Sequence, residues 1–89
     1  IRAEELVELF DHIRPDGSTC FDLMDANGVM YWSAGENIAA CGASAEQAMS
    51  MWMDSQGHKE NILCADFSQI GVGVFISGGY AYWVQLFIG

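Results

Sequence analysis

Two histidines and one glutamate are the side chains of this sequence with the clearest capacity for chemistry. His12 precedes an R-P-D-G turn sequence, Glu36 lies in the run S-A-G-E-N-I-A-A at 33–40, and His58 follows a glycine. Imidazole and carboxylate groups are common ligands of divalent metals, and three of them leave a fourth position open for water. The three residues are therefore candidate metal ligands, although their wide spacing does not establish the site.

The surroundings of Glu36 in the sequence raise a question about its partner. A buried carboxylate is unfavourable unless it is hydrogen-bonded, paired with a cation or bound to a metal. The neighbours of Glu36 are small or apolar, and the nearest basic residues, Arg14 and Lys59, are each more than twenty positions away. We therefore expect that Glu36 is either exposed or contacted by a residue distant in sequence.

The same three residues are also compatible with a purely structural cluster. His12 is expected near the end of a first helix, where the helix dipole favours a protonated imidazole without any ligand. His58 could cap a helix, and Glu36 could bond one histidine in a buried polar pair. A metal site and a hydrogen-bonded cluster therefore remain two open interpretations of His12, Glu36 and His58.

Nucleophilic and nucleotide-binding chemistry have less support. Ser55 and Cys64 flank His58, but neither stands in a G-x-S-x-G nucleophile turn. Gly71-Val72-Gly73 lacks the third glycine of a dinucleotide-binding loop and precedes no predicted helix. A covalent hydrolase and a phosphate-binding loop are both disfavoured.

Composition limits the class of protein and its partners. The chain has 89 residues, enough for one small domain, and a net charge of −9 with only three basic residues. Such a charge argues against nucleic acid or an anionic membrane as the partner. Cys20, Cys41 and Cys64 allow at most one internal disulfide and form no C-x-x-C pair. The sequence has no apolar run long enough to span a bilayer and no signal-peptide pattern at its start.

Short helices should position the candidate side chains. Apolar residues recur at helical spacing in residues 1–13, and Ser44 with Gln47 forms a capping-box pattern that opens a second clear helix. We expect helices over 1–13, about 19–26, 45–55 and 58–63, with Gln56-Gly57 as a break and a brief strand over 29–32.

The last third of the sequence predicts a β-hairpin. Residues 70–76 and 80–87 are rich in β-formers and are joined at Gly78-Gly79, which suits a two-residue primed turn. Val72, Val74 and Ile76 should share one face with Ala81, Trp83 and Gln85. The opposite face should carry Gly71, Gly73 and Phe75 with Tyr82, Val84 and Leu86. Because both faces are largely apolar, we expect helices to cover the sheet on both sides.

Several motifs together resemble a known family. They are R-A-E-E-L with F-D-H-I-R-P-D-G-S near the start, G-E-N-I-A at 35–39, W-M-D-S-Q-G-H-K-E-N-I-L at 52–63, F-S-Q-I-G-V-G-V at 67–74 and Y-W-V-Q-L-F at 82–87. In this order they resemble the bacterial SCP-like branch of the CAP superfamily, which includes cysteine-rich secretory and plant pathogenesis-related group-one proteins. The resemblance implies an α+β fold, a three-layer α-β-α sandwich with a small antiparallel sheet, formed by residues 1–89 as a single domain.

The resemblance also implies a cleft that holds two histidines and two acids. By motif, His12 and His58 match the histidines and Glu36 matches the glutamate of G-E-N. Ser55 stands where many eukaryotic members have a second glutamate, as is common in bacterial relatives, and this puts a four-residue metal site in doubt. The implied cleft residues are His12, Glu36, His58 and Ser55, with zinc or another divalent cation held by the first three.

The resemblance favours a secreted or cell-surface binding module, with a small molecule, lipid or protein as the partner at the cleft. The alternative is a metal-assisted hydrolase, with proteolysis as one candidate reaction, in which Glu36 acts as general base. Family members also have a longer segment before R-A-E-E-L. We therefore expect an N-terminally shortened domain with one sheet face partly bare, which would favour self-association.

Overall fold

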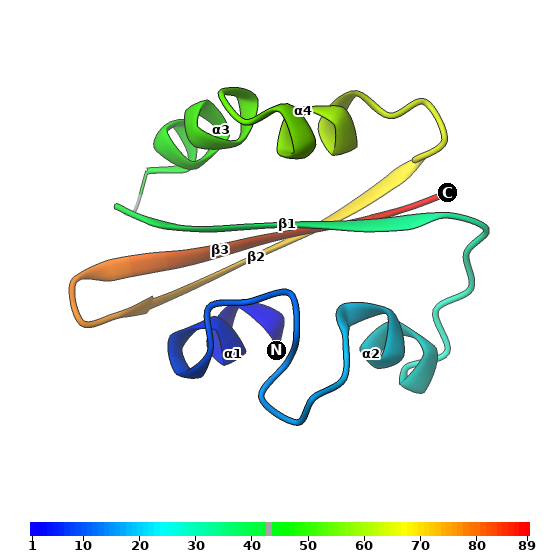
Figure 1. The fold of residues 1–89 in the computed structure, drawn as a ribbon, viewed down its shortest axis with the longest axis horizontal. Coiled ribbons are helices and arrows are strands. Elements are labelled where there is room, and N and C mark those ends of the chain that lie inside the picture. The colour runs from blue at the N-terminus through cyan, green and yellow to red at the C-terminus, as the bar shows by residue number, and fades with distance from the viewer. Residues whose placement is uncertain (43) are drawn as a thin grey trace.

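The computed structural model describes residues 1–42 and 44–89 and shows a three-layer α-β-α sandwich. The helices α1 and α2 lie on one side of a three-stranded sheet, and α3 and α4 lie on the other (Figure 1). The fold class predicted from the sequence is therefore confirmed. The elements in chain order are α1 (Arg2–Glu8), α2 (Cys20–Ala26), β1 (Ala34–Cys41), α3 (Ala45–Met53), α4 (Gln56–Leu63), β2 (Gln69–Ser77) and β3 (Tyr80–Ile88).

The sheet is antiparallel and has β3 at its centre, in the order β1-β3-β2. The β2–β3 hairpin turns through Gly78 and Gly79, whose φ angles of 59° and 84° are those of a primed turn. Val72 pairs with Gln85 and Val74 with Trp83, so the predicted division of the hairpin into two faces is confirmed.

Successive β1 residues point to opposite faces and so contribute to two separate cores. Ile38 packs against Ala3 and Leu6 of α1 and Val84 of β3. On the other face a larger cluster contains two tryptophans and four small residues: Ala39, Cys41, Ala48, Trp52, Ala81 and Trp83. Trp52 also donates its indole N–H to the Ile38 carbonyl at 3.0 Å, which attaches α3 to β1.

Two expected helix boundaries are wrong, and both concern the histidines. The first helix ends at Glu8, because Leu9 is extended and Asp11 Oδ1 accepts a hydrogen bond from the backbone N–H of Ile13. His12 therefore lies in a bend after α1 rather than at a helix end. The helix α4 begins at Gln56, so His58 lies in its first turn rather than after a break.

The expected strand over 29–32 is also wrong. Met30 and Trp32 are 91% and 99% exposed, and the strand begins only at Ala34. Sheet pairing decides this boundary, because β1 pairs with β3 from Ala34 onward and β-propensity without a partner strand is weak.

The helices α2 and α3 begin at capping residues, of which only Ser44 was predicted from the sequence. Thr19 and Asp22 form a capping box at α2, and the Ser44 side chain accepts from the Gln47 N–H at 3.3 Å. The Gln47 side chain does not complete the second box, since it accepts from the Gly42 N–H instead.

Candidate functional site

Glu36 is buried on the face of β1 that looks toward α1, and its partner is Arg2. The Arg2 guanidinium donates from Nε to Glu36 Oε2 at 2.7 Å and from Nη2 to Oε1 at 3.0 Å. Both side chains are almost completely buried, at 1% and 2% exposure. A two-pronged charge-assisted pair of this kind satisfies the buried carboxylate, and it joins residues 34 positions apart.

Arg2 is itself held by a wider network around α1. It donates to Glu5 Oε1 at 3.1 Å and to the Asp11 carbonyl at 3.0 Å, and Glu5 also accepts from Arg14 at 2.7 Å. Burial lowers the pKa of Arg2, but the hydrogen bonds to Glu36 and Glu5 and the negative charges of these two residues together raise it by more, so the net shift is upward. The hydrogen bonds from Arg14 lower the pKa of Glu5. Arg2 therefore stays charged and fixes Glu36 in place.

His12 completes the group at the surface end of this network. Its Nδ1 lies 2.9 Å from Glu36 Oε1, while 56% of its side chain is exposed. A carboxylate that accepts a hydrogen bond from Nδ1 selects the tautomer in which Nε2 carries no proton. The geometry therefore directs a free acceptor nitrogen of His12 away from Glu36.

A cavity of about 270 Å³ adjoins this histidine. Its wall combines polar groups with apolar ones, from the bend after α1, the start of α2, β1 and α4: His12, Thr19, Cys20, Phe21, Gly35, Glu36 and Asn61. Burial, together with the negative charge of Glu36, raises the pKa of Cys20 to about 12. A thiol with such a pKa is protonated at neutral pH, so Cys20 is a wall of the cavity rather than a nucleophile.

His58 is positioned by the residue that follows Glu36. Asn37 is fully buried on the opposite face of β1, and its Nδ2 donates to the His58 carbonyl and to Gln85 Oε1, both at 3.1 Å. Asn61 donates to Asn37 Oδ1 at 3.0 Å. Burial and the charge of His12 both lower the pKa of His58. The amide cluster therefore attaches the first turn of α4 to β1 and brings His58 within the electrostatic influence of His12.

Gly35 permits this close attachment of α4. A Cβ atom at this position would lie 3.0 Å from the Phe67 ring and 3.3 Å from Asn61 Oδ1. The absence of a side chain therefore allows α4 and the segment after it to approach β1 directly. The three successive residues of G-E-N thus have three roles. Gly35 allows α4 to approach β1, Glu36 pairs with Arg2, and the Asn37 amide binds α4.

The structure brings two of the predicted site residues into direct contact. His12 and Glu36 are hydrogen-bonded, whereas His58 is near but bonds neither of them through its side chain. Ser55 precedes α4, makes no side-chain capping bond and is not part of the cavity wall. Among residues 1–42 and 44–89 no group of three His, Cys, Asp or Glu side chains converges as a metal site would require.

Glu36 does not fit the role of a direct metal ligand. Both of its oxygens already accept from Arg2, and Oε1 also contacts His12. A metal at these oxygens would have to displace a buried cation, which is unfavourable. The imidazoles of His12 and His58 are the groups that remain available, and metal binding stays a prediction.

Sequence reasoning missed Arg2, Asn37 and Asn61. Arg2 carried a detectable signal, because it lies four residues before Leu6 and therefore on the apolar side of an otherwise acidic helix. Asn37 and Asn61 carried no such signal, since an asparagine in a strand or a helix is usually exposed. All three cysteines are free thiols in the structure. In the part of the chain that the structure describes, no helix is long and apolar enough to cross a membrane.

Comparison with known proteins gives consistent matches over nearly the whole chain. YkwD of Bacillus subtilis is 45% identical over 80 residues, which are 90% of this chain and 30% of that protein. YlbC of the same bacterium, described as an uncharacterized membrane protein, is 32% identical over 79 residues, or 89% of this chain and 22% of that protein.

A solved structure agrees with these relatives. An extracellular protein containing an SCP domain from Bacillus anthracis superposes with a TM-score of 0.87 at 31% identity, over 98% of this chain and 28% of that one. The chain thus spans less than a third of the length of each of these relatives. The model of the CAP family, the cysteine-rich secretory protein family, matches residues 2–87. This protein belongs to the CAP family and forms an SCP-like domain of it.

Proposed function

We propose that this CAP domain is a binding module of a secreted or cell-surface protein, and that its ligand enters the cavity beside His12. Extracellular placement is supported by the structural neighbour, which is an extracellular SCP-domain protein. The observation that carries the proposal is the 2.9 Å contact of His12 Nδ1 with Glu36, because a neutral ring that donates from Nδ1 keeps Nε2 as an acceptor, and His12 lines the cavity.

We propose further that a divalent cation such as zinc is held by His12 Nε2 and the imidazole of His58, with water in the remaining positions. Glu36 then orients His12 rather than binding the metal, which is the usual role of a carboxylate behind a zinc-bound histidine. Two protein ligands make a weak site, so we expect affinity in the micromolar range or weaker.

The hydrolase alternative has less support from the geometry. A general base must reach the proton that it removes, and Glu36 is 2% exposed in its side chain and engaged by Arg2. The group in the cavity that could accept a proton is His12, and no nucleophile with a lowered pKa stands beside it. We therefore favour binding over catalysis.

Calorimetric titration of zinc into chelator-stripped protein near pH 7 tests the metal proposal. The expected result is one-to-one binding that is lost in His12→Ala and in His58→Ala. Cys64→Ser is the matched control, because Cys64 is a partly exposed free thiol that could bind zinc elsewhere. Heat that disappears only in Cys64→Ser, or no heat in the parent protein, would contradict a metal site at the histidines.

A further inference from the structure

The strand β2 leaves one edge of the sheet open. It pairs with β3 on one side, and no described residue pairs with its other side. Edge strands usually carry charges or proline that prevent pairing with another chain. The nine residues of β2, Q-I-G-V-G-V-F-I-S, contain neither. Four β-branched side chains on one face of β2 are also 48–64% exposed: Ile70, Val72, Val74 and Ile76.

We propose that this edge is a homodimer interface, in which β2 pairs antiparallel with β2 of a second copy about a twofold axis at Gly73. The two sheets then form one continuous sheet. Backbone hydrogen bonds supply the attraction, and alternate side chains set the register, as in other cases of strand addition.

The sequence of β2 is self-complementary in this register. Residues whose numbers sum to 146 lie opposite one another, so Ile70 faces Ile76 and Val72 faces Val74 on one side of the sheet. Directly opposite β-branched residues pack well across antiparallel strands. On the other side Phe75 of one copy lies opposite Gly71 of the other.

The contrast between the two glycines of β2 selects this register. A Cβ atom at Gly73 would lie 3.2 Å from Val84 and 3.7 Å from Ala3, whereas Gly71 has no atom within 4 Å of that position. A twofold axis at Val74 would place Phe75 over the covered Gly73, and an axis at Val72 would place it opposite Gln69. Only the axis at Gly73 brings the ring to the open glycine, an arrangement known to stabilise strand glycines.

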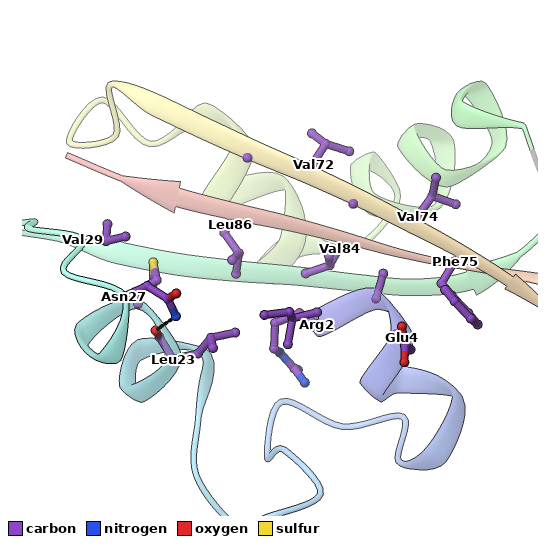
Figure 2. A pocket seen from close by; sticks show the side chains of 15 residues that line it. Arg2, Glu4, Leu23, Asn27, Val29, Val72, Val74, Phe75, Val84 and Leu86 are labelled. Carbon is purple, nitrogen blue, oxygen red and sulfur yellow. Dashed lines mark hydrogen bonds between the residues drawn. The ribbon is translucent and has the colours of Figure 1, made fainter.

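The space beside Gly71 is a groove of about 420 Å³ whose wall is mainly apolar and also includes Arg2, Glu4 and Asn27. Figure 2 shows Val84, Leu86 and Phe75 pointing into it from the sheet, while Val72 and Val74 point away toward the other face. In the proposed dimer the Phe75 ring of each copy covers the mouth of the other copy's groove at Gly71. The twofold axis makes the two insertions equivalent, as an isologous interface requires.

Charge and area make this dimer a weak one. Each copy carries a net charge of −9, so the copies repel, although β2 itself is uncharged. One strand pair with its side chains falls at the small end of specific interfaces, below roughly 1,200 Å² in total. Added salt screens the repulsion and should strengthen dimerisation.

Sedimentation equilibrium of the protein from low micromolar to near-millimolar concentration, at low and high salt, tests the proposal. We expect a monomer–dimer equilibrium that shifts toward dimer with salt. Val74→Lys should weaken dimerisation by on the order of ten-fold or more, because it sets two like charges diagonally across the strand pair. Met30→Lys makes the same charge change at a 91% exposed apolar residue outside β2 and should leave the equilibrium unchanged.

A second measurement keeps the result interpretable if Val74→Lys perturbs folding. In the parent protein, amide hydrogen exchange of alternate β2 residues should slow as concentration rises, while exchange in β1 stays constant. Phe75→Ala should weaken the dimer without adding charge. The proposal would be overturned if the protein stayed monomeric at every concentration. It would also be overturned if Met30→Lys disrupted the dimer and Val74→Lys did not, or if hydrogen exchange slowed in β1 instead of β2.

Discussion

Glu36 and Asn37 are neighbours in β1, and each is the centre of a buried polar cluster, but the two clusters are built differently. Glu36 looks toward α1 and is satisfied chiefly by the Arg2 cation, and His12 Nδ1 also contacts it. Asn37 looks toward α4 and is satisfied by neutral amides and a carbonyl. The first cluster positions a histidine through its side chain, and the second positions the other histidine through its backbone.

The difference teaches how one short strand segment can position two separate groups. An ion pair out of water depends on both partners, because a single remaining charge is strongly unfavourable. An amide cluster contains no charge that could be left unpaired, so the loss of one hydrogen bond lowers stability by less. The charged cluster should therefore be the more sensitive of the two to mutation.

The largest expected effect is that of Arg2→Met. It leaves the Glu36 carboxylate buried without its cation, and we expect the free energy of unfolding to fall by about 3–5 kcal/mol. Urea unfolding followed by circular dichroism measures the change. The double variant Arg2→Met with Glu36→Leu should recover much of the lost stability. A double variant as unstable as Arg2→Met would contradict the explanation that the unpaired charge of Glu36 causes the loss.

Asn37→Ala should have the next largest effect. It removes partners from the His58 carbonyl, Gln85 and Asn61 together, and we expect a loss of about 1–3 kcal/mol. The same unfolding experiment at about pH 8, where His58 is neutral in both the folded and the unfolded chain, measures this loss without a contribution from the His58 titration. Gln56→Ala, which removes an exposed contact with Glu60 in the same helix, serves as the control and should change stability little.

The smallest effect concerns the pKa of His58. Burial, and next the charge of His12, hold this pKa below its ordinary value of 6.5. Between these two pKa values His58 is protonated more fully in the unfolded chain than in the folded chain. The free energy of unfolding should therefore fall as the pH decreases from 6.5 toward the pKa of His58 in the folded protein. His12→Gln removes the smaller cause, and an NMR titration should show the His58 pKa rising while remaining below 6.5. An unchanged pKa would mean that the two rings do not interact.

Local signals in the sequence predicted the fold well where they were strong. The Thr19 to Ala26 region, the Ser44 cap and the Gly78-Gly79 turn all appear in the structure because each rests on contacts between residues close in sequence. The two-residue turn at Gly78-Gly79 set the register of β2 against β3 and so predicted the two faces of the hairpin. These features needed no knowledge of distant partners.

The site could be predicted only in part, because its partners are distant. His12 and Glu36 were identified from the sequence. Arg2 was not paired with Glu36, because the two are 34 positions apart in sequence and no local pattern indicates that they meet. The strand β1 was missed because it buries polar and small residues on both faces and so lacks apolar alternation. In contrast, Val29-Met30-Tyr31-Trp32 has strong β-formers but no strand beside it.

The central place of β3 also sets the order in which the domain can be completed. β1 and β2 do not pair with each other, and both pair with β3, whose residues follow theirs in the chain. During synthesis neither strand has a sheet partner until β3 has left the ribosome. Because Ala34 then pairs with Ile88, the contact that closes the sheet joins the two most distant strands, and such long-range closure is slow. The β2–β3 hairpin is local and can form once β3 is available, whereas β1 joins it across a long stretch of chain, so the sheet between the two helical layers is completed last.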